Sequence, residues 1–165
     1  MRTWLTKEPQ TVVQCLLLIG FVLLLNYVYH LVVMSFLVDT LGGFDQIRMR
    51  ETIEEMLRVK MTSTVHFLAF LISGVIVEEL TYRAFPLFIA IQLGSKKYVV
   101  VILVLISSVV FGFDHGGPVY ILMQGVTGLV YSFLFLTCGG WRGALFKPFA
   151  VSTTAHLIWN LFWIL

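Results

Sequence analysis

The sequence predicts an all-α fold, a polytopic membrane bundle of about five transmembrane helices with one amphipathic helix at the membrane surface. Of its 165 residues, 59% are hydrophobic and only 12% are charged, whereas a soluble domain carries roughly 25% charged residues. The mean hydropathy is +0.94, and long apolar runs recur along the chain. So few charged side chains cannot cover a water-facing surface, which excludes an ordinary soluble domain.

Five apolar segments approach the roughly 20 residues that a membrane-spanning helix needs. They cover about residues 11–38, 62–91, 98–114, 118–138 and 148–165. The second is long and interrupted by polar residues, and the last three are short. The first is longer than the apolar region of about 7–15 residues in a signal peptide, and no A-x-A site follows it. We therefore expect it to remain as a membrane anchor.

The segment 45–60, DQIRMRETIEEMLRVK, separates the first two apolar runs. Ile47, Ile53, Met56 and Leu57 fall near one helical face, and four acidic and four basic residues surround them. This pattern indicates an amphipathic helix that lies on the membrane surface. A plain helical linker and a substrate-docking element are both consistent with it.

The charges and cysteines point to no nucleic-acid or metal partner. The net charge is +2, and the basic residues are scattered, so nothing indicates binding to nucleic acid. Cys15 and Cys138 both lie inside apolar runs, with no CxxC pair and no Cys/His spacing typical of zinc sites. We interpret both as small packing residues.

The basic residues also suggest an orientation. With five spans, three connections fall on the same side, and they carry Arg2 and Lys7, Lys96 and Lys97, and Arg142 and Lys147. The positive-inside rule then places the N-terminus in the cytoplasm and the C-terminus outside. The basic residues of 45–60 fall on the opposite side, where acidic neighbours offset them.

Ionisable residues inside an apolar run are functional candidates, because a charge at the bilayer centre costs on the order of 3 kcal/mol. The second segment contains Glu78-Glu79-Leu80-Thr81-Tyr82-Arg83. Glu79 and Arg83 are four residues apart, so they share a helical face and can pair, while Glu78 points about 100° away. A structural ion pair explains Glu79 and Arg83 but leaves Glu78 unpaired. A carboxylate of that kind suits general-base work.

Two further clusters carry histidines. Phe111-Gly112-Phe113-Asp114-His115 ends the third segment, and the following Gly-Gly-Pro stops the helix. His115 is a site candidate, although an interfacial histidine fits equally well. In the last segment, His156 and Asn160 lie one turn apart and can donate hydrogen bonds to one point, as an oxyanion hole requires. Hydrogen bonds between membrane helices are the alternative.

Two other polar positions receive a structural interpretation. Asn26 and His30 form a similar pair in the first segment, but no third partner accompanies them, so we interpret them as helix-packing residues. His66 lies near the start of the second segment and is expected at the membrane interface.

Together, the three clusters resemble the signature of the CAAX prenyl protease/ABI family, also called CPBP intramembrane glutamate proteases. The matching residues are Glu78-Glu79-x-x-x-Arg83, Phe111-x-x-x-His115 and His156-x-x-x-Asn160. The string EELTYRAF is close to the family pattern EELxFRG, with Tyr82 where Phe is common and Ala84 where Gly is common. The resemblance covers roughly residues 62–163. It divides the chain into an anchor and surface helix, 1–61, and a family-like catalytic core, 62–165.

The resemblance implies a four-helix catalytic core and peptide-bond hydrolysis without a covalent intermediate or a cofactor. By that analogy, Glu78 and His115 activate a water, His156 and Asn160 stabilise the oxyanion, and Glu79 and Arg83 support them. Phe111 is expected to pack. Asp114 is an added acid beside His115. The implied partners are the lipid bilayer and a peptide or prenylated protein substrate, and the implied location is a multi-pass position in the plasma membrane if the source is prokaryotic.

Two other functions remain open at this stage. Glu78, His115 and His156 are possible zinc ligands, although the chain has no HExxH motif and Asn160 is a poor ligand. The same fold also serves as a non-catalytic membrane partner, for bacteriocin immunity or membrane-protein scaffolding. The sequence does not indicate the oligomeric state or the physiological substrate.

Overall fold

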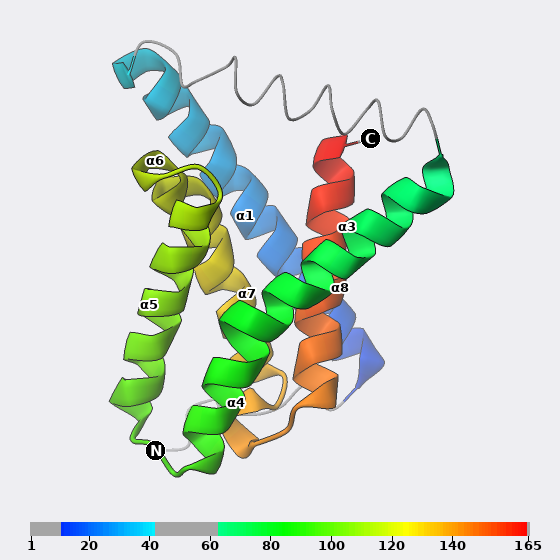
Figure 1. Cartoon of the computed structure of the whole chain (residues 1–165), viewed down its shortest axis with the longest axis vertical. Helices are drawn as coiled ribbons and strands as arrows, with labels where there is room; N and C mark the ends of the chain where they lie inside the picture. Colours follow the sequence, from blue (N-terminus) through cyan, green and yellow to red (C-terminus); the bar gives the residue numbers. More distant parts are fainter. Residues whose placement is uncertain (1–10, 42–62, 165) are drawn as a thin grey trace.

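The computed structural model describes residues 11–41 and 63–164, and this part of the chain is helical without strands. The elements are α1 (Val12–Leu41), α3 (Thr64–Glu79), η2 (Leu80–Ala84), α4 (Phe85–Gln92), α5 (Lys97–Asp114), α6 (Pro118–Tyr120), η3 (Ile121–Gly125), α7 (Val126–Thr137), η4 (Gly140–Arg142) and α8 (Phe146–Ile164). The predicted all-α bundle is therefore confirmed (Figure 1). The predicted surface helix over 45–60 lies outside the described residues.

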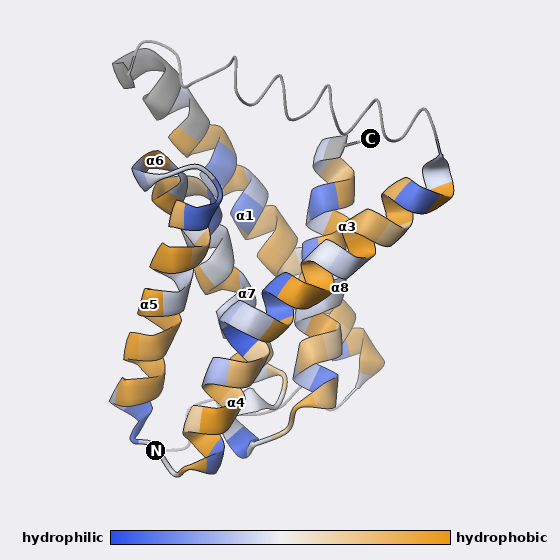
Figure 2. Ribbon diagram, viewed as in Figure 1, coloured by the Kyte–Doolittle hydropathy of each residue, from blue (hydrophilic) through white to orange (hydrophobic). Residues whose placement is uncertain are grey.

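Four of the five predicted spans are long and apolar enough to cross a membrane. Within the described residues they are Val12–Val33, Thr64–Gln92, Lys97–Asp114 and Pro118–Thr137. The fifth predicted span is a helix of 19 residues, α8, but it does not meet the same measure of length and hydropathy. Its buried face carries the polar residues Ser152, Thr153 and His156. The outward faces of the bundle are largely apolar (Figure 2), as expected for a protein surrounded by lipid.

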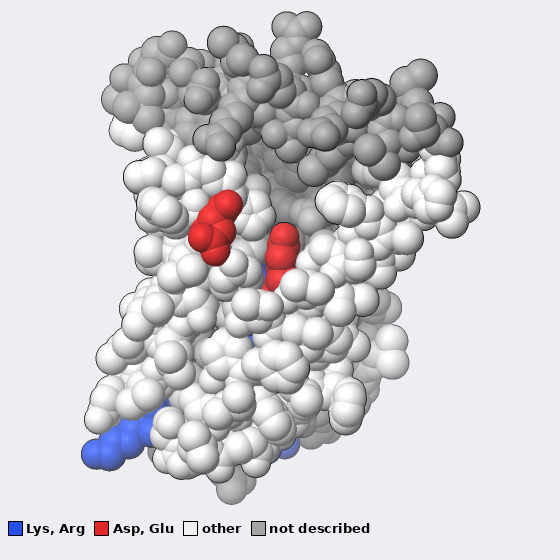
Figure 3. All heavy atoms as spheres, in the orientation of Figure 1, with Lys and Arg blue, Asp and Glu red and all other residues white. Residues whose placement is uncertain are grey.

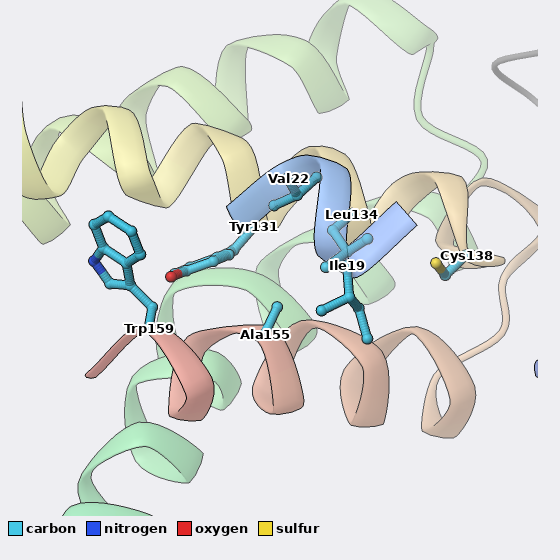
Figure 4. Packing of buried hydrophobic residues seen from close by; sticks show 7 residues of the cluster. All are labelled: Ile19, Val22, Tyr131, Leu134, Cys138, Ala155 and Trp159. Carbon is cyan, nitrogen blue, oxygen red and sulfur yellow. The ribbon is translucent and has the colours of Figure 1, made fainter. Parts of the chain in front are cut away.

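The centre of the bundle lies where α7 and α8 pack against each other and against α1. An apolar cluster there contains Ile19, Val22, Tyr131, Leu134, Cys138, Ala155 and Trp159 (Figure 4). On the other side, α3 packs against α8, and α5 packs against η3 and α7. A second cluster joins α4, α5 and α7 through Leu87, Val100 and Phe135. These contacts hold α3, α5 and α8, which carry the predicted site residues, around a single interior.

The helix from Thr64 to Gln92 is interrupted by the π-helical turn η2, in which the N–H of Phe85 reaches back five residues to the carbonyl of Leu80. Single π-turns inside α-helices often occur at functional sites. Here the turn begins directly after Glu79 and contains Arg83.

Close approach of α5 and η3 requires a glycine. A Cβ on Gly112 would lie 2.6 Å from the Cα of Ile121 and 2.8 Å from the backbone N of Gly125. Those contacts are with backbone atoms, so no side-chain rearrangement would relieve them. Gly112 therefore fixes how near the helix that carries His115 lies to its neighbour.

The anchor helix α1 is joined to α7 by a buried polar cluster of Asn26, His30 and Thr127. The Thr127 hydroxyl lies 2.9 Å from Nε2 of His30 and 3.1 Å from Oδ1 of Asn26. All three residues are at most 3% exposed. The interpretation of Asn26 and His30 as helix-packing residues is therefore confirmed, and the third member of the cluster, Thr127, lies 97 positions beyond His30 in the chain.

Both cysteines are buried free thiols, as the sequence suggested. Burial raises the pKa of the Cys138 thiol to about 12, so it stays protonated at neutral pH. Cys15 lies beside it and contributes to that pKa, which places the first turn of α1 next to the end of α7. His66 is exposed in the first turn of α3, where the Ser63 hydroxyl accepts a hydrogen bond from its backbone N–H.

Candidate active site

The two adjacent glutamates at the end of α3 face different surroundings. Glu79 is fully buried, and its Oε1 accepts a hydrogen bond from Nη1 of Arg83 within an ion pair. The side chain of Glu78 is 31% exposed, and among the described ion pairs Arg83 pairs with Glu79 and not with Glu78. As the sequence predicted, the carboxylate of Glu79 is paired with Arg83 and that of Glu78 is not. Arg83 neutralises the charge of Glu79, because an unpaired carboxylate buried inside the bundle would have a high free energy.

Aromatic rings enclose the Arg83 guanidinium. Its Cζ lies 4.4 Å from the ring centroid of Phe111 and 5.4 Å from that of Tyr131. An aromatic face attracts a cation, and more strongly where water is excluded. A Cβ on Gly128 would lie 3.3 Å from Nη2 of Arg83, so this glycine leaves the space that the guanidinium fills. Phe111 packs at the site, as predicted.

His156 connects the two glutamates. Its Nδ1 lies 2.9 Å from Oε1 of Glu79, and its Nε2 lies 3.5 Å from Oε2 of Glu78. A carboxylate in a buried ion pair accepts hydrogen bonds, so Nδ1 carries a proton and Nε2 is the nitrogen that faces the open side of the site. The ring of Tyr131 stacks on the imidazole at a centroid distance of 4.8 Å. His156 is therefore held on both its edge and its face.

His115 faces the other oxygen of Glu78. Its Nε2 lies 3.8 Å from Oε1 of Glu78, and its side chain is 30% exposed. Its Nδ1 lies 2.7 Å from the backbone carbonyl of Phe111, which can only accept. The proton of a neutral ring is therefore on Nδ1, and Nε2 presents a lone pair toward the carboxylate. Each oxygen of Glu78 thus faces one imidazole, from α5 on one side and α8 on the other.

Asn160 lies one turn beyond His156 on α8 and is half-buried. Within the described part of the chain, its side-chain amide makes no hydrogen bond. The structure thus brings together Glu78, Glu79, Arg83, Phe111, His115 and His156, and leaves the Asn160 amide available to an incoming group.

Tyr82 and Asp114 were singled out in the sequence separately, as a family departure and as an added acid, and they pair with each other. The Tyr82 hydroxyl donates to Oδ2 of Asp114 at 2.6 Å. Tyr82 follows Glu78 by four residues, and Asp114 precedes His115. This hydrogen bond therefore joins the helix that carries Glu78 to the helix that carries His115.

Tyr131 is a site neighbour that the sequence reasoning missed. It is fully buried, between His156 and Arg83. Its position in the sequence was a usable signal. Tyrosines of membrane proteins favour the two membrane interfaces, whereas Tyr131 lies within an apolar span, which indicates a specific partner inside the bundle.

The described residues contain no group of three or more His, Cys, Asp or Glu side chains arranged to hold a metal ion. The predicted alternative of zinc bound by Glu78, His115 and His156 therefore has no ligand group in this part of the chain.

Comparison with known families gives one result. The sequence model of the type II CAAX prenyl endopeptidase Rce1-like family matches residues 60–162, well over half of the chain. Searches of curated proteins and of solved structures found no match. The matched range contains the Glu78 to Arg83 motif and the motifs that end at His115 and Asn160. This membrane protein belongs to the type II CAAX prenyl endopeptidase Rce1-like family.

Proposed function

We propose that this protein is a multi-pass intramembrane endopeptidase, located in the plasma membrane if its source is prokaryotic, that hydrolyses a peptide bond of a membrane-associated or lipidated, CAAX-type protein. The observation that carries the proposal is the position of Glu78 between His115 and His156, with separations of 3.8 and 3.5 Å. It is a partly exposed carboxylate within an apolar bundle, and the buried charge next to it is already paired.

Glu78 and His115 are the pair that activates water. A water about 2.8 Å from both Oε1 of Glu78 and Nε2 of His115 fits their 3.8 Å separation. Glu78 takes one proton, and the His115 lone pair accepts the second hydrogen bond and orients the oxygen. The oxygen then adds to the scissile carbonyl, and the proton on Glu78 passes to the leaving amine as the C–N bond breaks. No covalent enzyme intermediate forms.

His156 and Asn160 are the donors for the oxyanion. The Nδ1–H of His156 is committed to Glu79, so only Nε2 faces the substrate. Donation from Nε2 requires the doubly protonated ring, and the carboxylates of Glu79 and Glu78 on either side are suitable partners for that cation. Asn160 donates from its amide. Removing one such donor typically slows catalysis by about 10²–10³-fold.

The deciding experiment compares newly formed protein termini in host membranes that carry wild type, Glu78→Ala or His66→Ala at matched expression. His66 is an exposed residue outside the site, so its variant is the matched control. We expect new termini with wild type and His66→Ala, and their loss with Glu78→Ala and with His156→Ala, because removal of a general base costs about 10²–10⁴-fold. Size-exclusion profiles check that each variant is folded.

Two results would redirect the assignment. Cleavage by Glu78→Ala at the wild-type rate overturns the mechanism. Identical terminal profiles for all variants, together with a host phenotype that Glu78→Ala retains, identify the protein as a non-catalytic membrane partner in immunity or scaffolding.

A further inference from the structure

Tyr131 on α7 presents the face of its ring to His156. The two rings are stacked, with a centroid distance of 4.8 Å and an interplanar angle of 28°. Phe111 meets the same imidazole edge to face, at 6.0 Å and an interplanar angle of 83°. The guanidinium of Arg83 lies nearer to the ring of Phe111, at 4.4 Å, than to that of Tyr131, at 5.4 Å. Phe111 is thus the closer aromatic face for Arg83, and Tyr131 is the stacked face for His156.

The hydroxyl of Tyr131 does not explain its place in the fold. Tyr131 is 0% exposed, and within the described residues its hydroxyl has no hydrogen-bond partner. Buried tyrosines usually place that group on a partner. The ring is the rest of the side chain, and its faces carry partial negative charge that attracts cations. What Tyr131 contributes to the site therefore comes from its ring.

Two carboxylates on α3 make the position of His156 suitable for a cation. Glu79 lies 2.9 Å from its Nδ1, and Glu78 lies 3.5 Å from its Nε2. Glu78 also faces His115 of α5, and His30 of α1 faces a threonine of α7. The imidazole is 3% exposed, so solvent screens these charges little. On the face drawn in Figure 3, acidic and basic atoms reach the surface in different places.

Arg83 competes with His156 for the same carboxylate oxygen. Oε1 of Glu79 accepts from Nη1 of the guanidinium and also lies 2.9 Å from Nδ1 of the imidazole. One negative charge therefore serves two side chains, and a positive charge on His156 is only partly offset there. The stacked ring of Tyr131 adds a face that attracts a cation at this point.

We propose that Tyr131 is a positioning residue for the hydrolysis, and that the face of its ring stabilises the doubly protonated form of His156. The inference rests on the proposed peptidase activity, in which only that form donates from Nε2 to the oxyanion. An aromatic face attracts a cation most strongly where water is excluded, and both side chains are almost fully buried. The ring thus increases the fraction of the enzyme that is ready to donate. A smaller fraction lowers kcat and leaves KM unchanged, because the oxyanion forms only after the substrate has bound.

The experiment changes the electron density of the ring and nearly preserves its shape. Tyr131→Phe is the reference, and phenylalanines with one, two or three ring fluorines then replace it in the full chain, in detergent micelles. Each fluorine withdraws electron density from the face that attracts a cation. Phe135 lies one turn farther along α7 and is 0% exposed in the second apolar cluster. The same fluorinated residues at position 135 are the matched control.

Two measurements are made on each variant. Nitrogen-15 NMR of histidine-labelled protein at a fixed pH gives the ratio of doubly to singly protonated His156, whose signal is assigned by its loss in His156→Ala. Initial rates on a farnesylated, quenched-fluorescent peptide that ends in a CAAX sequence give kcat and KM.

From Tyr131→Phe to the trifluorinated ring, we expect the ratio to fall about tenfold and kcat to fall with it, while KM stays unchanged. Tyr131→Phe itself should retain at least half of the wild-type kcat, because the hydroxyl has no partner in the described part of the chain. Ring fluorines at Phe135 should change neither the ratio nor kcat.

A ratio that stays constant along the series overturns the inference, and so does an equal fall when Phe135 is fluorinated. A change in thermal stability with a constant ratio and a constant kcat assigns the aromatic face to Arg83 and also overturns it. Failure of the wild type to cleave the peptide counts against the proposed function, whereas the NMR ratio still decides the role of the ring.

Discussion

Two neighbouring glutamates, identical in chemistry, are separated by helix geometry into different surroundings. Glu79 points into the bundle and is fully buried with Arg83, whereas Glu78 is 31% exposed toward His115. Adjacent positions on a helix differ by about 100° in direction, so one carboxylate can be structural while the next faces the site. The buried pair is favourable only while both members are present, because an unpaired buried charge is costly.

Substitution of one partner of the buried pair should therefore lower the free energy of unfolding more than substitution of both. Arg83→Met leaves the Glu79 carboxylate buried without its cation, and we expect the free energy of unfolding to fall by about 3–5 kcal/mol. The double variant Arg83→Met/Glu79→Gln should recover part of that loss. Denaturant unfolding of the detergent-solubilised protein measures both. A double variant no more stable than Arg83→Met would contradict this account of the pair.

At the scale of the elements, one contact joins the helices that carry Glu78 and His115, and a second holds the His115 helix against its other neighbour, η3. One is the hydrogen bond from Tyr82 to Asp114 at 2.6 Å, and the other is the close approach of α5 to η3 at Gly112. Neither involves a proposed reacting group. Since Glu78 and His115 are only 3.8 Å apart, small shifts of one helix relative to the other change whether both reach one water.

The Tyr82–Asp114 hydrogen bond is testable by a double-mutant cycle. Tyr82→Phe removes only the donor, and Asp114→Ala removes the acceptor. We expect a coupling free energy of about 1 kcal/mol in unfolding, the value for a hydrogen bond that is partly exposed to solvent. Additive effects of the two substitutions would show that the contact contributes nothing to helix placement.

Gly112→Ala should destabilise the protein although alanine favours helices. The added Cβ meets the backbone of Ile121 at 2.6 Å, and overpacking of this kind costs about 1–3 kcal/mol. Gly74→Ala is the matched control, because Gly74 is also helical and its added Cβ meets nothing within 4 Å. We expect Gly74→Ala to be neutral or to stabilise by up to about 1 kcal/mol. Thermal unfolding compares the two, and equal midpoints would contradict the close approach of the helices.

At the scale of the whole molecule, α1 is part of the bundle core. It lies outside the matched range 60–162, yet Ile19 and Val22 belong to the central apolar cluster. The hydroxyl of Thr127 also joins it to α7 through His30 and Asn26. Thr127 adjoins Gly128, which leaves the space for the Arg83 guanidinium. The anchor helix is thus connected through packed residues to the charged centre.

Thr127→Val tests this connection while nearly preserving side-chain volume. It leaves the polar atoms of His30 and Asn26 buried without their partner, and we expect a loss of about 1–3 kcal/mol in the free energy of unfolding. Ser35→Val on the exposed surface of α1 is the control and should change stability by less than about 0.5 kcal/mol. A Thr127→Val variant as stable as wild type would show that the cluster contributes no net stability.

The helices and much of the candidate site were predictable because their signals are local. Apolar runs of membrane-spanning length located the helices, and the four-residue spacing of Glu79 and Arg83 predicted their pairing. The partners of Asn26, Tyr82 and Tyr131 were not predictable, because each depends on which helix faces which. The π-turn at Leu80–Ala84 was not predicted either, because no residue type is characteristic of the place where an α-helix widens into a π-turn. The segment that forms α8 was predicted as a span because it is an almost continuous apolar run, but in the described residues it does not meet the measure of hydropathy that the other four meet.

The hydrogen bond between Glu79 and His156 joins residues 77 positions apart in the chain. Ribosomes add about 5–20 residues per second, so the glutamate-bearing helix emerges about 4–15 s before its histidine partner exists. During that interval the nascent helix carries Glu78, Glu79 and Arg83 without α8 beside it. The local pairing of Glu79 with Arg83, one turn apart, is then the only neutralisation that the helix itself supplies. We therefore expect this helix, with Glu78 still unpaired, to be less stable in lipid before α8 is made than after α8 packs against it.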